Sequence, residues 1–247
     1  GDVAIADHLK SSGDYIKNKS VKFVNMSFAI GYPGAPMSAP RQSFYFLERI
    51  FSMNPDTLFV VAAGNARGAA LNLDLKGNDN YPASYEYKNM LKVGAINSDK
   101  LEDEKYASYR PAFFSKFGIT KVQVFAPGQG VVSAQSGGGD IGLNGTSMAA
   151  PFVLNVILKA HAINKNLTPM QLKEIVLKTA FVPLSGPLDC QSGGVIVPKR
   201  VYKVVNDLLE NKGDIEQQIV KAREEIRLDG EIEDTRVLNL IWSVRGL

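Results

Sequence analysis

Cysteine and net charge are scarce in this sequence and long apolar runs are absent, and each shortage excludes a class of protein. Cys190 is the single cysteine among 247 residues, so an internal disulfide is excluded. Lys and Arg number 28 against 25 for Asp and Glu, and a net charge of +3 is too small to indicate nucleic acid as a partner. No run of about 18 apolar residues occurs, so no membrane span is expected. The first five residues lack the basic and apolar stretches of a signal peptide.

What is present is the composition of a folded globular chain. Apolar residues make up 45% and charged residues 21%, which excludes disorder of the whole chain. The length suits one large α/β domain or two small ones. Apolar patterning predicts helices over residues 3–18, 38–54, 147–165 and 168–180, and strands over residues 21–26, 58–63, 90–96, 122–125 and 195–197. Strands that alternate with helices at this spacing predict a parallel sheet flanked by helices.

The last forty or so residues differ in charge from the rest. Residues 206–247 hold 10 acidic and 6 basic residues, a net charge of −4, so the remainder carries +7. Ile215, Ile219, Ala222 and Ile226 follow a helical stripe. We therefore predict that residues 206–247 form a helical C-terminal extension that packs on the domain before it or on another element.

The strongest chemical signal is the run Asn-Gly-Thr-Ser-Met-Ala-Ala-Pro at residues 144–151. A proline is tolerated within the first turn of a helix, so Pro151 predicts a helix that begins near Thr146 to Met148. The hydroxyl and backbone N–H of Ser147 then lie at the positive end of the helix, where a developing oxyanion is stabilised. Taken alone, the Gly-Thr-Ser run favours an ordinary helix N-cap, because capping serines far outnumber nucleophiles.

Two strand ends add polar groups to this picture. The buried strand over residues 58–63 ends in Gly64 and Asn65, which would project a carboxamide from the carboxyl edge of the sheet. Open α/β sheets place their sites at that edge, although Asn65 could also be a turn residue. A second strand ends in Asn25-Met26-Ser27 and is followed by small residues.

Together these segments resemble the subtilisin-like serine proteases (subtilases) over about residues 20–205, in the family's order. The resemblance implies a three-layer α/β fold with a mostly parallel sheet flanked by helices, incomplete at its N-terminal side. Residues 1–205 are then a partial catalytic domain. The activity it implies is that of a serine endopeptidase.

Carried over position by position, Ser147 resembles the nucleophile and Asn65 the side-chain donor of the oxyanion hole. Ser27, Phe28 and Ala29 resemble the edge segment that pairs with the substrate backbone. The stretches Ala62-Ala63-Gly64 and Asn80 to Ala83 resemble the walls and floor of the primary specificity pocket. Two positions depart from the family pattern: Ala29 stands where glycine is usual, and Asn80 stands where a small residue often occurs, which predicts a tighter mouth and a polar or shallow floor.

The proton relay of the family has no counterpart in the sequence. A serine hydroxyl needs a neighbouring base, and in this family the Asp and His precede the Ser in the chain. Neither of their motifs is present. His161 lies 14 residues after Ser147 on the same predicted helix, about 21 Å away, so it is expected to be a packing or surface residue. His8 lies on the first predicted helix and is expected to be solvated.

We therefore predict an incomplete catalyst that is inactive alone, with Asp and His supplied by an upstream segment or by another chain. The alternative is a degenerate pseudoprotease or peptide-binding module, which would still hold an extended peptide or protein at residues 27–29. An α/β-hydrolase elbow is disfavoured because Ala149 occupies the position of its second glycine. Subtilases are mostly exported, so a secreted or cell-envelope location is expected from the resemblance only.

No cofactor is expected, although an oxygen-rich loop invites comparison with a calcium site. Asp74, Asn78, Asp79 and Asn80 cluster in the sequence, and subtilases often bind calcium. The spacing does not match an EF-hand, and a solvated turn is the favoured interpretation.

Overall fold

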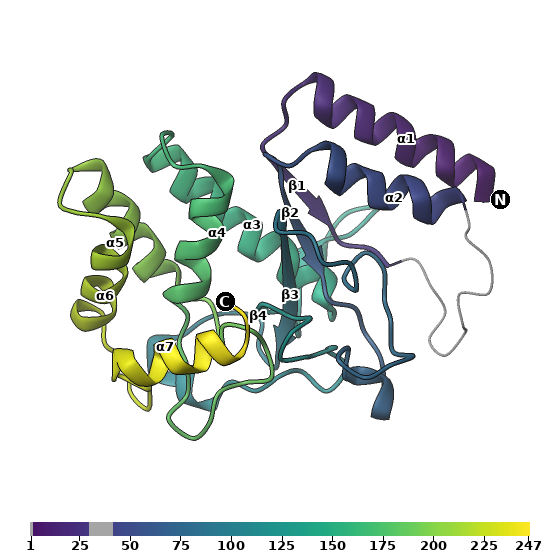
Figure 1. Cartoon of the computed structure of the whole chain (residues 1–247). Coiled ribbons are helices and arrows are strands. Elements are labelled where there is room, and N and C mark those ends of the chain that lie inside the picture. Colours follow the sequence, from purple (N-terminus) through teal and green to yellow (C-terminus); the bar gives the residue numbers. More distant parts are fainter. Residues whose placement is uncertain (1, 30–41) are drawn as a thin grey trace.

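A four-stranded parallel sheet forms the centre of the computed structural model, which describes residues 2–29 and 42–247. The strands are β1 (Phe23–Met26), β2 (Leu58–Ala62), β3 (Met90–Ile96) and β4 (Val124–Pro127), hydrogen-bonded in that order. Helices α1 (Asp2–Asn18) and α2 (Gln42–Met53) cover one face. Helices α3 (Thr146–Ile163), α4 (Pro169–Lys178) and α5 (Pro198–Leu209) cover the other (Figure 1). The predicted three-layer α/β fold is confirmed.

Alternating side chains of the central strands supply two separate cores. Val60 of β2 and Val93 of β3 point into the core beneath α3, α4 and α5. Their neighbours Phe59 and Val61 point into the core beneath α1 and α2, together with Leu47 of α2. Burial on both faces explains why β2 is a continuous apolar run, and β3 nearly one apart from Lys92, rather than alternating patterns.

Most predicted elements lie within a few residues of the observed ones. The strand predicted over residues 122–125 is displaced to Val124–Pro127. Residues 195–197 form no strand of their own, although Val195 bridges to Phe125 and to Phe181. The first residues of the helix predicted over 38–54 lie outside the described part of the chain, and the described helix begins at Gln42. Helix α4 begins at the predicted place because Thr168 and Gln171 form a capping box.

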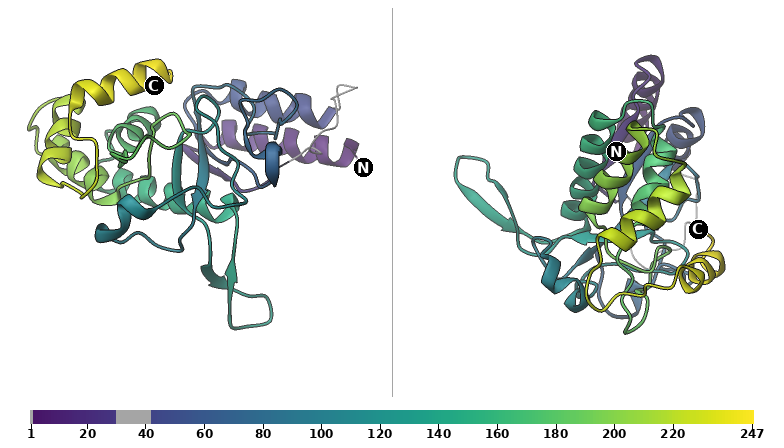
Figure 2. Two further views of the ribbon diagram at one scale, coloured as in Figure 1. Left: turned by 90° about the horizontal axis from the view of Figure 1, so that it is seen from below. Right: turned by 90° about the vertical axis from the view of Figure 1, so that its left-hand side faces the viewer.

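A hairpin that the sequence pattern did not reveal precedes the nucleophile-like serine. Strands β5 (Val131–Ala134) and β6 (Asp140–Leu143) pair antiparallel and project away from the body (Figure 2). Its side chains are mostly exposed, with Val132 at 64%. Because the hairpin buries little apolar surface, its sequence has no periodic apolar pattern from which it could be predicted.

After α5 the C-terminal residues form two more helices, α6 (Ile215–Glu225) and α7 (Thr235–Val244). The predicted boundary between residues 205 and 206 falls inside α5, so the helix runs continuously across it. Helix α6 packs on α5 and α4. Trp242 of α7 donates its indole N–H to the Ser192 carbonyl over 3.1 Å. The extension therefore packs on the same body as the sheet.

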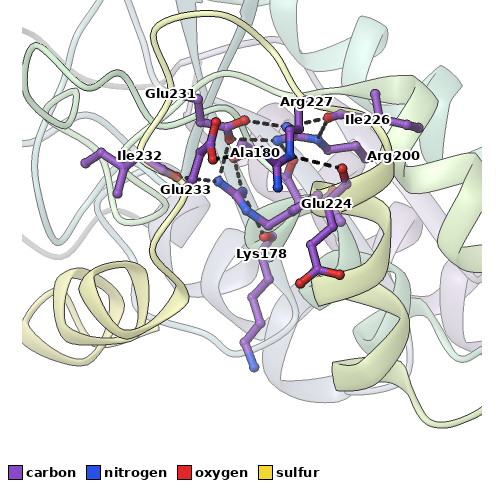
Figure 3. Close-up of polar contacts among 11 residues, drawn as sticks. Lys178, Ala180, Arg200, Glu224, Ile226, Arg227, Glu231, Ile232 and Glu233 are labelled. Carbon is purple, nitrogen blue, oxygen red and sulfur yellow. Dashed lines mark hydrogen bonds and ion pairs between the residues drawn. The ribbon is translucent and has the colours of Figure 1, made fainter.

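A buried charge cluster fastens α5, α6 and the segment between α6 and α7 together. Arg200 of α5 and Arg223 of α6 both pair with Glu231, and the Arg200 and Glu231 side chains are 0% and 4% exposed. Figure 3 shows Arg200 pointing toward Glu231 and the Ile226 carbonyl, to which its Nε donates over 2.9 Å. Arg223 Nη1 donates to the Ala180 carbonyl over 2.6 Å. Two guanidinium groups thus share one carboxylate and several backbone carbonyls.

Helix α3 is long and apolar enough to cross a membrane by length and composition alone, and it is the one such helix in the described part of the chain. Its buried residues, including Ala149, Val153 and Ile157, belong to the core that it shares with the sheet. This packing is that of a core helix.

Candidate active site

The carboxyl ends of β1 and β2 meet the first turn of α3. Gly64 and Asn65 lie two and three residues after the end of β2, and Ser27 directly follows β1. The backbone N–H of Gly64 donates to Thr146 Oγ1 over 3.0 Å. Residues separated by more than 80 positions are thus brought to one point at the carboxyl edge of the sheet, where α/β folds place their sites.

Asn65 is held by its oxygen. Its Oδ1 accepts hydrogen bonds from the backbone N–H of Thr146 at 3.0 Å and from Thr146 Oγ1 at 3.2 Å. A Cβ placed on Gly145 would lie 3.3 Å from Asn65 Nδ2, so the amide nitrogen lies beside the turn that precedes Ser147. Among the described residues Nδ2 donates no hydrogen bond, which leaves an N–H2 group oriented at the start of α3.

Ser147 is the second residue of α3, so its N–H is one of the four that an α-helix leaves without an internal partner. The half-buried side chain donates through Oγ to the Ser27 carbonyl over 3.1 Å. In return Ser27 Oγ donates to the Ser147 carbonyl over 2.8 Å. The hydroxyl, an N–H without a partner inside the helix and the carboxamide of Asn65 are therefore gathered at one helix N-terminus.

The position of Pro151 corrects a sequence-based expectation. Helix α3 begins at Thr146, so Pro151 is its sixth residue and not part of the first turn. A proline there removes the N–H that would bond the carbonyl four residues earlier, which is the carbonyl of Ser147. That carbonyl instead accepts the Ser27 hydroxyl. The helix tolerates the proline because another strand supplies the missing donor.

Gly64 and Asn80 form a close contact beside this site. A Cβ on Gly64 would lie 2.3 Å from Asn80 Nδ2, and Gly64 also has a positive φ of +103°, so only glycine fits. Asn80 Nδ2 donates to the Ala63 carbonyl over 3.1 Å. The polar or shallow pocket floor expected from Asn80 stays a prediction.

The segment after β1 is open to solvent. Phe28 is 39% exposed and Ala29 is also exposed, while Ser27 is half-buried by its contacts with Ser147. The structure thus brings Ser27, Asn65 and Ser147 together, with Phe28 and Ala29 leading away from them. The residues beyond Ala29 that would continue this segment lie outside the described part of the chain.

Within the described residues no histidine or carboxylate side chain hydrogen-bonds Ser147. His161 lies in the last turn of α3 and packs edge-on against Phe23, with ring centroids 5.1 Å apart. Burial, with the nearby charge of Lys22, lowers its pKa. His8 is exposed on α1. His161 therefore lies at the far end of the helix that Ser147 begins, and no hydrogen bond joins His8 to Ser147 among the described residues.

The oxygen-rich loop serves the fold. Asp74 accepts a hydrogen bond from Thr120 Oγ1 at 2.8 Å and one from Lys121 N at 3.1 Å. Asn78 Nδ2 donates to the carbonyls of Ala69 and Asn72, each over 2.7 Å. The described part of the chain contains no group of three or more His, Cys, Asp or Glu side chains arranged to hold a metal ion.

Sequence reasoning missed Thr146, whose hydroxyl and N–H join Gly64 to Asn65. It also missed the Ser27 side chain, because only its backbone was expected to matter. The signal for Thr146 was its place in the Gly-Thr-Ser run, since a threonine next to a glycine turn can reach neighbouring backbone groups. Chemically, the part of the site that the structure describes offers a hydroxyl and two N–H donors but no base.

The chain has recognisable relatives. Residues 3–219 match the sequence profile of the Subtilase family. Subtilisin-like protease 1 of Plasmodium berghei (strain Anka) is 33% identical over 180 residues, which are 70% of this chain and 28% of that protein. The chain thus spans less than a third of that relative's length.

Solved structures share the fold. A cold-adapted subtilisin-like serine proteinase superposes with a TM-score of 0.51 at 24% identity, covering 71% of this chain and 55% of that one. The A-subunit of the AB5 toxin from E. coli superposes with a TM-score of 0.58 at 23% identity, covering 75% of this chain and 60% of that one.

Proposed function

The chain belongs to the subtilase family of serine proteases, and from that premise we propose that it is the nucleophile-bearing part of a serine endopeptidase. Ser147 attacks the peptide carbonyl, and the oxyanion is held by Asn65 Nδ2 and the Ser147 N–H. The observation that carries the proposal is the anchoring of Asn65 through Oδ1 to Thr146, which leaves its N–H2 group beside the turn before Ser147.

The extended substrate is proposed to pair with the backbone of Ser27, Phe28 and Ala29 as an added strand. Ala63 and Gly64 line the pocket for the side chain before the scissile bond. The contact of Asn80 with Gly64 supports a polar floor there.

The proton relay is proposed to come from an upstream segment that carries Asp and His. Two observations support this: the described residues offer no base to Ser147, and β1 is the least buried strand of the sheet, with one edge unpaired among the described residues. This chain alone is then expected to be inactive. Export of the protein stays an expectation from the family.

The test uses the full-length protein and a fluorophosphonate probe, which modifies activated serines. We expect labelling at Ser147, its loss in Ser147→Ala, and unchanged labelling in Ser136→Ala, a control on the exposed hairpin. In Asn65→Ala we expect peptide turnover to fall by about 10²–10³-fold, the size of effect measured for the corresponding amide in subtilisin itself. Asn239→Ala, an exposed asparagine of α7, is the matched control.

The competing function is a peptide-binding pseudoprotease, which the open segment after β1 would also allow. A full-length protein that binds peptides but is not labelled at Ser147 would support it. Labelling that persists in Ser147→Ala would refute the assignment of Ser147 as the nucleophile.

A further inference from the structure

Ser27 and Ser147 hold each other through a reciprocal pair of hydrogen bonds. Ser147 Oγ donates to the Ser27 carbonyl over 3.1 Å, and Ser27 Oγ donates to the Ser147 carbonyl over 2.8 Å. The two residues are 120 positions apart and lie on different elements, the end of β1 and the first turn of α3. The pair therefore fastens the start of the helix to the edge of the sheet.

The Ser147 carbonyl is available for this bond because of Pro151. In a regular α-helix that carbonyl would accept the N–H of residue 151, and proline has no N–H. A carbonyl without a hydrogen-bond partner in a partly buried site destabilises the fold. The Ser27 hydroxyl supplies the donor that the helix lacks.

The Asn25 side chain orients the Ser27 hydroxyl. Asn25 Nδ2 donates to Ser27 Oγ over 2.9 Å. An oxygen that accepts this N–H has its own proton free to donate, and the Ser147 carbonyl lies within reach. The three groups form a chain, from the Asn25 amide through the Ser27 hydroxyl to the Ser147 carbonyl.

We propose that Ser27 is a positioning residue: its hydroxyl replaces the main-chain bond that Pro151 removes and thereby fixes the first turn of α3, with Ser147 on it, against strand β1. The consequence for catalysis rests on the proposed function, whereas the hydrogen-bond replacement does not. Without the hydroxyl the first turn can shift, and a shift of about 1 Å in a reacting group can slow a reaction about 10²-fold.

The positioning role belongs to the Ser27 side chain, whereas the proposed pairing with substrate belongs to its backbone. The backbone carbonyl, proposed to pair with substrate, remains in Ser27→Ala, so the half-saturating concentration of substrate should change little. The maximal rate should fall roughly tenfold to a hundredfold. Ser27→Thr keeps a hydroxyl and should retain most of the activity.

The decisive experiment is a double-mutant cycle between Ser27 and Pro151 in the full-length protein. Pro151→Ala restores an N–H that can donate to the Ser147 carbonyl as an ordinary helix bond. The rate of fluorophosphonate labelling at saturating probe should therefore fall in Ser27→Ala and recover largely in the double variant. Ser133→Ala, on the exposed strand β5, should leave the rate unchanged.

A second measurement keeps the two proposals distinguishable. The amides that follow Ser147 should exchange with solvent faster in Ser27→Ala than in the unmodified protein, and the double variant should recover their protection. If the unmodified protein is not labelled at all, the proposed function fails while the exchange data still test the hydrogen bond. Either of two results refutes the positioning role. One is that Ser27→Ala slows labelling by the same factor in the Pro151→Ala background as in the unmodified protein. The other is that Ser27→Ala leaves the exchange of the amides after Ser147 unchanged.

Discussion

Lys92 carries an amine in the middle of a buried strand. It lies in β3, its side chain is 5% exposed, and Nζ donates to the Tyr85 carbonyl over 3.0 Å. Burial, followed by the nearby charge of Lys121, lowers its pKa to about 8. Relative to the unfolded value near 10.5, this difference corresponds to about 3 kcal/mol of destabilisation at neutral pH.

The free energy of unfolding should consequently depend on pH through Lys92. Below pH 8 both states carry the proton, and the destabilisation is complete. Between about pH 8 and 10.5 the unfolded state binds the proton that the folded state has released, so stability rises with pH. Urea denaturation from pH 7 to 10 should show this rise, reduced in Lys92→Met and unchanged in Lys76→Met, an exposed control. An equal rise in Lys92→Met and the unmodified protein would contradict the prediction.

At single residues, sequence reasoning identified groups that a motif fixes and missed those that depend on contacts across the fold. Asn65 and Ser147 could be predicted because each lies in a short run with a clear local structure. The bond between the Ser27 hydroxyl and the Ser147 carbonyl could not, because it joins residues 120 positions apart. The position of Pro151 was predicted wrongly for the same reason. The rule that proline occurs in the first turn of a helix is local, whereas the distant Ser27 hydroxyl allows Pro151 in the second turn of α3.

At the level of elements, the attachment of the last helices depends on one carboxylate. Glu231 neutralises only one of the two guanidinium groups it contacts, Arg200 and Arg223. Burial lowers the pKa of Arg223 to about 10, although the charge of Glu231 opposes that shift. Removal of one partner from a buried ion pair destabilises a protein by about 3–5 kcal/mol, because the remaining charge stays buried.

Glu231→Gln should therefore loosen α6 and α7 from the body. We expect a loss of about 3–5 kcal/mol in the free energy of unfolding, measured by urea denaturation at pH 7. Glu233→Gln is the matched control, because Glu233 and its partner Arg227 are both well exposed, and exposed pairs contribute little. A loss of similar size in both variants would show that the buried cluster has no special role.

Elements were predictable where they bury an apolar face. The strands near residues 58–63 and 90–96 are buried on both faces and are apolar apart from Lys92, so their sequence alone indicates them. The hairpin of β5 and β6 buries little and left no periodic signal. The predicted boundary after residue 205 rested on a change in net charge. Charged residues on a helix surface do not indicate where the helix ends, and α5 continues to Leu209.

For the whole molecule, the open edge of β1 marks where the sheet is expected to continue. Leu58 N–H donates to the Lys22 carbonyl over 2.9 Å, so backbone groups of even-numbered residues face β2. Alternate residues of a strand direct their backbone groups to opposite edges. Those of Phe23 and Asn25 therefore face the edge that pairs with no strand among the described residues. Unpaired strand edges invite pairing with another segment.

The proposed upstream segment is expected to add a strand along this edge, which would bring the proposed Asp and His toward Ser147. Hydrogen exchange resolved to single amides should then show Phe23 and Asn25 protected as strongly as Val24, whose N–H faces β2. Phe59, inside the sheet on β2, provides the reference for full protection. If Phe23 and Asn25 exchange at unprotected rates while Val24 is protected, the edge is open in the whole protein. The base would then have to approach Ser147 from a loop or from another chain.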